Sequence, residues 1–244
     1  MASILVVREY DNFSSTLEQH NFSVINCPTV KTFPIKDLSD FRATIAAIEN
    51  YHGIFLTSPN ATQIFIEILQ EKNIEYGGKI YVLGKRSFDI LKTCKLDLFF
   101  DESANTAREL LDNIPAKELD KKRFLFVRGE KSLRVVPEFL ARFAALDETI
   151  VYESRKITVE TGKINEIREQ IEKSEITAVC FFSPSGAESF LEQLGADVLH
   201  QTRIATIGKT TADYFGKHSL TVDFISARAT AEDFASGLAE HLKV

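Results

Sequence analysis

Residues 178–194 read AVCFFSPSGAESFLEQL, and residues 53–69 read GIFLTSPNATQIFIEIL. In both stretches an apolar run ends in a Ser-Pro turn, and a pattern with helical spacing follows. Ser58 and Ser183, which open the two turns, are 125 residues apart. A short apolar run that leads through a turn into a helix is typical of a buried strand in an α/β sheet. The two stretches therefore predict an α/β fold in which one unit occurs twice.

Other segments repeat at nearly the same spacing. A shift of 124 residues places KIYVLGKRSFDIL (79–91) on RIATIGKTTADYF (203–215). A shift of 120 residues places Val7-Arg8 on Val127-Arg128. A period this long excludes a solenoid, whose repeats are roughly 20 to 50 residues. The chain is predicted to be an internal duplication.

Each half alternates apolar runs with helical patterns. The runs expected to be strands are residues 4–8, 22–28, 53–57, 80–83 and 96–100 in the first half, and 123–127, 149–153, 178–182, 204–207 and 222–225 in the second. Continuous apolar strands separated by helices indicate a parallel sheet covered on both faces, so each half should be a small flavodoxin-like lobe. The sequence suggests a division near residue 120 and leaves open an exchange of strands through linkers at 29–37 and 153–163.

The composition excludes several classes of protein. The chain has 244 residues, 44% of them hydrophobic, which is enough for one large domain or two small ones. No apolar run approaches the roughly 20 residues of a membrane span, and the N-terminal MASILVVREYD lacks the basic start of a signal peptide. We therefore expect a cytoplasmic protein without a membrane association. The net charge of −6 argues against a nucleic-acid partner.

Metal and nucleotide motifs are absent from the sequence. Three widely spaced cysteines form neither a disulfide framework nor a Cys-x-x-Cys site, and the five histidines form no metal-binding pair. Cys180 lies inside an apolar run and is expected in the core. Ile207-Gly208-Lys209-Thr210 resembles the end of a phosphate-binding loop, but Arg203 stands where that motif requires glycine.

Polar turns follow several of the predicted strands, and ligands of open parallel sheets bind at those strand ends. Serine before proline caps a following helix, and glycine lets a ligand approach the backbone. The first-turn N–H groups and the helix dipole then favour an anion. A single turn of this kind is usually only a cap, but its recurrence in both halves predicts an anion-accepting cleft between the lobes. Thr230, by contrast, is expected to be a helix cap with Asp233 reaching back.

Six phrases, taken together, resemble the uroporphyrinogen-III synthase family, and they occur in the family's order over most of the chain. They are LTSPNA (56–61), FVRGE (126–130), TIVYES (149–154), FFSPSGAESF (181–190), ATIGKTTADYF (205–215) and TAEDFASGL (230–238). The departure from the family pattern is Lys209. The resemblance implies two flavodoxin-like lobes with parallel sheets, joined by a two-stranded β connector, with the N-terminal strands in the C-terminal lobe. It assigns residues 1–30 plus 158–244 to the first lobe, 36–150 to the second, and 31–35 and 151–157 to the connectors.

The family's reaction is the cyclisation of hydroxymethylbilane, a linear tetrapyrrole with eight carboxylates, to uroporphyrinogen III. Water is lost and ring D is inverted, in the pathway to heme. Without enzyme the bilane closes readily to the type I isomer, so the protein has mainly to select a geometry. The resemblance implies no cofactor and no metal. It further implies a monomer that contacts the preceding enzyme of the pathway only transiently.

The resemblance also implies residue roles. Tyr152 matches the tyrosine that the family places in its cleft, and it is the expected proton donor to the departing hydroxyl. The residues expected to bind the substrate are Ser58, Asn60, Ala61, Lys85, Arg128, Gly129, Ser183, Ser185, Gly186, Gly208, Lys209, Thr210 and Thr211. Arg8 is a further candidate for positive potential.

Two other functions use the same features. One is a non-catalytic, two-lobed cytosolic binding protein for a small anion, with the same turns. The other is an assembly module in which one lobe docks a partner, although such a module has no need of hydroxyl-rich turns in both halves. Turnover separates the synthase from both.

Overall fold

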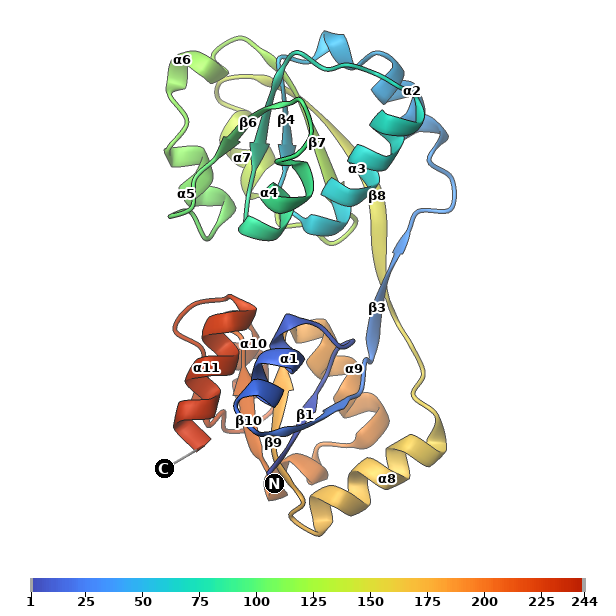
Figure 1. The fold of residues 1–244 in the computed structure, drawn as a ribbon, viewed down its shortest axis with the longest axis vertical. Helices are drawn as coiled ribbons and strands as arrows, with labels where there is room; N and C mark the ends of the chain where they lie inside the picture. Colours follow the sequence, from blue (N-terminus) through green and yellow to red (C-terminus); the bar gives the residue numbers. More distant parts are fainter. Residues whose placement is uncertain (1, 243–244) are drawn as a thin grey trace. The chain divides into compact units, whose positions relative to one another are not determined.

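A computed structural model describes residues 2–242 of the chain. Met1 and residues 243–244, which belong to the predicted first lobe, lie outside the described residues. The chain forms two compact units (Figure 1). Unit 1 contains the residues up to Lys31 together with those from Arg155 onward, and unit 2 is Thr32–Ser154.

Unit 1 is built around a five-stranded sheet with the order β11-β10-β9-β1-β2. Every pair of neighbouring strands in it is parallel. Its strands are β1 (Ser3–Val6), β2 (Ser23–Asn26), β9 (Ile176–Phe181), β10 (Arg203–Thr206) and β11 (Phe224–Ile225). Its helices are α1 (Asn12–Gln19), α8 (Thr161–Glu172), α9 (Pro184–Leu194), the short 3₁₀ turn Asp197–Gln201, α10 (Lys209–Lys217) and α11 (Ala231–Leu242).

Unit 2 is built around a six-stranded sheet with the order β3-β8-β7-β4-β5-β6. Its strands are β3 (Val30–Pro34), which begins in unit 1, β4 (Gly53–Leu56), β5 (Lys79–Val82), β6 (Asp97–Phe100), β7 (Arg123–Gly129) and β8 (Ala145–Lys156), which ends in unit 1. Its helices are α2 (Ser39–Ala46), the 3₁₀ turn Ile48–Asn50, α3 (Pro59–Glu71), α4 (Lys85–Leu91), α5 (Ala107–Asp112), α6 (Ala116–Leu119) and α7 (Val135–Leu140).

The two sheets place repeated strands at equivalent positions. The order β2-β1-β9-β10-β11 in unit 1 corresponds to β8-β7-β4-β5-β6 in unit 2, with the repeat relating β1 to β7, β4 to β9 and β5 to β10. Each sheet therefore takes strands from both halves of the duplication. In Figure 1 the N-terminal strand β1 lies beside β9, which is more than 160 residues later in the chain.

The apolar runs form buried strands because helices cover both faces of each sheet. In unit 1, α8, α9 and α10 pack on one face through Phe190 and Phe215, and α1 and α11 pack on the other through Phe13 and Phe234. In unit 2, α2, α3 and α4 cover one face, and α5, α6 and α7 cover the other. Each unit thus has its own hydrophobic core on both sides of its sheet.

A two-stranded ladder of β3 and β8 connects the units (Figure 1). The Ile35 N–H donates to the Val151 carbonyl, and the Ile157 N–H donates to the Thr29 carbonyl. Because the partner's number falls as the residue number rises, the two strands are antiparallel. The predicted fold class, two lobes with parallel sheets and a two-stranded β connector, is confirmed.

Two of the three cysteines lie in the core. Cys180 is fully buried, as predicted, and Cys27 is 2% exposed. Burial raises the pKa of the Cys27 thiol to about 11 and also raises the pKa of Cys180. Neither thiol is therefore suited to act as a nucleophile at neutral pH.

In the described part of the chain, no helix is long and apolar enough to cross a membrane.

Candidate functional site

Helix α9 begins at the Ser183-Pro184 turn, where β9 ends. The Ser183 Oγ accepts a hydrogen bond from the Gly186 N–H at 3.1 Å and lies 3.2 Å from the Ser185 Oγ. Ser183 has an extended backbone, and Pro184 takes the first helical position, where no N–H is needed. The predicted cap is therefore confirmed at Ser183.

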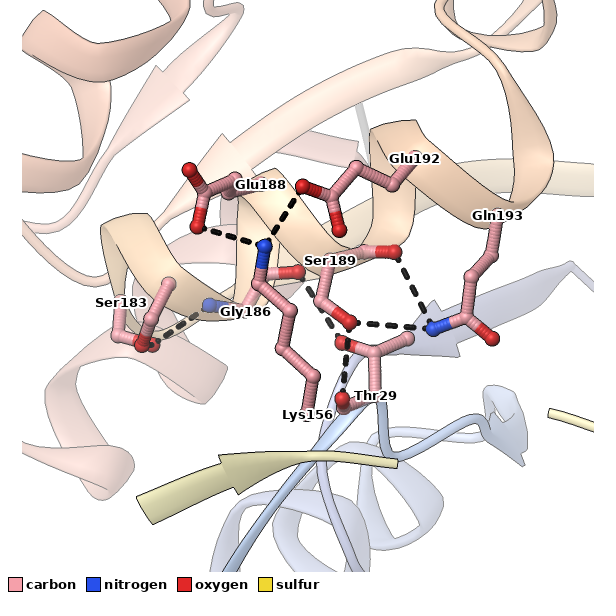
Figure 2. A network of polar contacts seen from close by, with 9 residues as sticks. Thr29, Lys156, Ser183, Gly186, Glu188, Ser189, Glu192 and Gln193 are labelled. Atoms are coloured by element: carbon pink, nitrogen blue, oxygen red, sulfur yellow. Dashed lines mark hydrogen bonds and ion pairs between the residues drawn. The ribbon is translucent and has the colours of Figure 1, made fainter. Parts of the chain in front are cut away.

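The same turn is fixed from the connector by Thr29, which directly precedes β3 (Figure 2). The Thr29 hydroxyl donates to the Gly186 carbonyl at 3.1 Å, and the Ser189 hydroxyl donates to the Thr29 carbonyl at 2.9 Å. Thr29 and Ser189 are fully buried. Gly186 is thus held at its N–H by Ser183 and at its carbonyl by Thr29.

Gln193 joins the other connector to the same helix. Its Nε2 donates to the Ile157 carbonyl at 3.0 Å and to the Ser189 Oγ at 3.1 Å, and its Oε1 accepts from the Val159 N–H at 2.8 Å. We call Thr29, Ser189 and Gln193 the α9 clamp. The clamp was not predicted, because its bonds to Thr29, Ile157 and Val159 join α9 to residues that only the tertiary fold brings close.

The cap at Ser183 has a measurable contribution to stability. Replacing Ser183 with alanine leaves the Gly186 N–H without its acceptor, and we expect a loss of about 1 kcal/mol in the free energy of unfolding of unit 1. Urea denaturation of Ser183→Ala measures this loss. Ser23→Ala, at an exposed position on β2, is the control and should lie within about 0.5 kcal/mol of the unchanged protein. Equal stability of both variants would contradict the assigned cap.

The Ser58-Pro59 turn of unit 2 has a different role for its serine. Ser58 caps no N–H of α3, so the predicted cap is wrong there. Instead its Oγ accepts a hydrogen bond from the Tyr152 hydroxyl at 2.9 Å. The serine is half-buried, and so is the tyrosine. The structure therefore brings together the expected proton donor and one expected binding residue.

Gly129 provides the surface on which the Tyr152 ring lies. A methyl group added at Gly129 would lie 2.4 Å from the tyrosine Cζ and 2.7 Å from its hydroxyl oxygen, far inside van der Waals contact. Gly129 is itself buried. The absence of a side chain at residue 129 is therefore required by the tyrosine rather than by a turn.

Two of the four expected cations are already paired. The Arg128 Nε donates to the Glu148 carboxylate at 2.7 Å, and the same carboxylate is 2.7 Å from the Arg134 guanidinium. The side chain of Arg128 is only 13% exposed. Arg8 pairs with Asp11 at 2.8 Å and stacks on the Phe182 ring at 4.3 Å. These contacts reduce the positive potential that either arginine offers to a ligand.

Lys85 and Lys209 lie just beyond the ends of β5 and β10. They are the first residues of α4 and α10, directly after Gly84 and Gly208. Both are exposed, and within residues 2–242 neither side chain forms an ion pair or hydrogen bond. A cation at a helix N-terminus adds to the positive end of the dipole, so these positions are favourable for an anion.

The remaining expected binding residues differ in accessibility. Asn60 and Thr210 are exposed, and Ser185 and Gly208 are half-buried. Ala61 is fully buried and Thr211 is 3% exposed, so in this conformation their side chains pack in the core.

Thr230 caps α11, since its Oγ1 accepts from the Asp233 N–H at 3.1 Å, while the Asp233 carboxylate accepts from the threonine hydroxyl at 2.6 Å. Among the described residues no group of three or more His, Cys, Asp or Glu could hold a metal ion.

Comparison with known proteins gives one consistent result. The sequence model of the family described as "Uroporphyrinogen-III synthase HemD" matches residues 11–236. A uroporphyrinogen-III synthase of Chlorobaculum parvum is 29% identical over the full length of both chains. The crystal structure of the Helicobacter pylori uroporphyrinogen-III synthetase matches with a TM-score of 0.65 at 17% identity, over 99% of this chain and 100% of that one. A mutant Thermus thermophilus uroporphyrinogen III synthase matches with a TM-score of 0.64 at 15% identity, over 100% of this chain and 99% of that one. These two structures are similar to this chain in fold.

Proposed function

Since the chain belongs to the uroporphyrinogen-III synthase family, whose sequence model spans residues 11–236, we propose how its residues divide the work of that reaction. The protein is an enzyme of tetrapyrrole biosynthesis that cyclises hydroxymethylbilane to uroporphyrinogen III with loss of water and inversion of ring D. The family match does not favour a non-catalytic binding protein for a small anion. Nor does it favour an assembly module.

Lys85 and Lys209 attract the carboxylates of the substrate. The observation that carries this assignment is their equivalent position, at the first residue of a helix that follows a core strand, without an ion-pair partner within residues 2–242. The exposed Asn60 and Thr210 supply polar groups in the first turns of α3 and α10. Each unit thus has a helix N-terminus that favours the binding of an anion.

Tyr152 donates the proton that lets the hydroxyl of the bilane leave as water. The tyrosine is half-buried with its hydroxyl hydrogen-bonded to Ser58, so the O–H is held at a defined position. The resulting azafulvenium is attacked by ring D at its substituted α-carbon, which forms a spiro intermediate. Fragmentation and reclosure invert the ring, and the proton released as the last pyrrole regains aromaticity returns to the tyrosine. A positioned acid is worth roughly 100-fold or more in rate.

Selection of geometry is the larger part of the task, because the free bilane already closes to the wrong isomer. Rigid placement of the carboxylates restricts ring D to the attack that gives the spiro intermediate. The α9 clamp contributes here by fixing the Ser183–Gly186 turn from two connectors. Ser183 and Ser185 present their hydroxyls at that fixed turn.

Isomer analysis tests the proposal. Hydroxymethylbilane is generated in situ, the purified protein is added, and the oxidised products are separated into types I and III. We expect mainly type III, and type I alone at the uncatalysed rate would overturn the function.

Lys209→Gln should raise the KM by roughly tenfold with a smaller change in kcat, because a lost ion pair with the substrate weakens binding. Lys217→Gln, at the opposite end of α10, is the matched control and should leave the KM unchanged.

We further propose that the enzyme is a cytoplasmic monomer that binds no nucleic acid and meets the preceding enzyme of the pathway only transiently. Free cysteines at Cys27, Cys94 and Cys180 are typical of a reducing compartment. The net charge of −6 disfavours a polyanionic partner. Equilibrium sedimentation tests the oligomeric state.

A further inference from the structure

A bulge in the parallel ladder of β7 and β8 places Tyr152 opposite Gly129. Arg128 pairs with Ile150, but the next residue of β7, Gly129, pairs with Tyr152, so β8 contains one extra residue at this point. Bulges are uncommon in parallel pairs, and they change the direction of a side chain beside active sites. The Glu130 N–H donates to the Tyr152 carbonyl at 2.9 Å, which fixes the strand directly after the bulge.

Beyond the bulge, two residues define the position of the tyrosine side chain. The ring occupies the space that any side chain at residue 129 would fill, as the 2.4 Å approach to Cζ demonstrates. At the other end, the Ser58 Oγ accepts a hydrogen bond from the tyrosine hydroxyl at 2.9 Å. Ser58 comes from the end of β4, the strand next to β7, so two neighbouring strands hold one phenol.

The hydroxyl of Ser58 is unusually free for an N-cap position. It caps no backbone N–H, and within the described residues Tyr152 is the single side-chain partner of its Oγ. A serine hydroxyl can both accept and donate a hydrogen bond. The Ser58 proton is therefore available to rotate toward the phenol oxygen when that oxygen loses its own proton.

Unit 1 provides an internal comparison. The Oγ of the equivalent Ser183 accepts a hydrogen bond from the Gly186 N–H and lies beside the Ser185 Oγ, not beside a phenol. The duplication thus kept the Ser-Pro turn in both units but gave the serine a tyrosine partner in unit 2. A purely structural serine would be expected to cap its helix in both places.

We propose that Ser58 and Gly129 are positioning residues for Tyr152 rather than contacts for the substrate. Gly129 admits the ring, and Ser58 holds the O–H until the substrate arrives. As the Tyr152 proton passes to the departing hydroxyl to form water, the Ser58 O–H turns and donates to the phenolate oxygen. When the proton returns at the end of the reaction, the original hydrogen bond is restored. The inference rests on the proposed role of Tyr152 as proton donor.

A double-mutant cycle tests the proposal with the full-length chain. Ser58→Ala and Gly129→Ala should each lower kcat for type III product by roughly tenfold, with the KM changed less than about twofold. In the Tyr152→Phe background neither change should lower kcat further. Ser58→Thr, which keeps the hydroxyl, should recover most of the rate. Gly162→Ala, at a position where an added methyl group meets nothing within 4 Å, is the control and should have unchanged kcat.

The outcomes separate this inference from the function itself. Additive losses in kcat, or losses confined to the KM, would overturn the positioning role and return Ser58 and Gly129 to substrate binding. Full turnover by Tyr152→Phe would also overturn it, while leaving the synthase reaction intact. Type I product alone from the unchanged protein would overturn the proposed function. If Gly129→Ala does not fold, the Ser58 arm of the cycle alone decides the inference.

Discussion

Tyr152→Phe should form type III product roughly 100-fold more slowly than the unchanged protein, toward the lower end of the range for general acid catalysis. The lower end applies because the bilane loses its hydroxyl readily without enzyme. Phenylalanine keeps the ring that fills the space beside Gly129 and removes only the hydroxyl that donates a hydrogen bond to Ser58. The change in rate therefore measures the contribution of the proton donor without a change in how the ring packs.

The isomer ratio gives a second readout of the same variant. As the enzymatic route slows, spontaneous closure competes for the substrate, so the proportion of type I product should rise in step with the loss of kcat. Phe88→Ala, a partly buried change elsewhere in unit 2, serves as the control for a general loss of stability. A Tyr152→Phe enzyme with the normal rate and pure type III product would remove the tyrosine from the mechanism.

Phe181→Ala should produce the largest loss of stability, about 3–5 kcal/mol in the unfolding of unit 1. Phe181 is fully buried at the end of β9. Its ring makes edge contacts with Phe190, at 5.2 Å between centroids, and with Phe215, at 4.7 Å. Removing it opens a cavity among helices α9 and α10, whose first turns carry the predicted binding groups. A loss of this size is a large part of the roughly 5–15 kcal/mol that stabilises a typical domain.

Hydrogen exchange followed residue by residue would measure this effect, because it reports the two units separately. Protection of the β9 and β10 amides should fall, while protection of β4 and β7 should stay unchanged, since unit 2 has its own core. Phe143→Ala, at a side chain that is 36% exposed, is the matched control with a much smaller expected loss. Equal loss of protection in both units would show that they unfold together.

The Ser-Pro turns show how far local sequence could go. Apolar runs, proline and helical spacing were sufficient to place β4 before α3 and β9 before α9. They could not distinguish Ser183, which caps its helix, from Ser58, which does not. The difference depends on Tyr152, which comes 94 residues after Ser58 and reaches it only through the pairing of β8 with β7.

The cations show the same limit. Arg128 and Lys209 both follow core strands and were equally good candidates for anion binding. Glu148, on the neighbouring strand, neutralises the arginine, whereas no residue within 2–242 pairs with the lysine. Whether a cation is available to bind an anion depends on which side chains lie beside it in the fold, and the sequence alone does not give those neighbours.

The exchange of strands likewise required more than periodicity. Repeats at 120 to 125 residues predict two similar sheets whether each half keeps its own strands or trades them. The resemblance to a known family decided in favour of exchange, and the sheet orders agree with it.

The exchanged strands impose an order on folding during synthesis. Unit 2 is a continuous segment that is complete once Ser154 has left the ribosome, so its sheet can form while the rest of the chain is still being made. β1 and β2 are made before unit 2, yet β1 pairs with its second neighbour, β9, only after more than 160 further residues have been made. The nascent chain therefore carries the apolar run ILVV, residues 4–7, without its partner strand β9 for most of its translation. β1 is thus made before unit 2 but completes its sheet after it, which leaves a long interval in which a nascent-chain chaperone can bind β1.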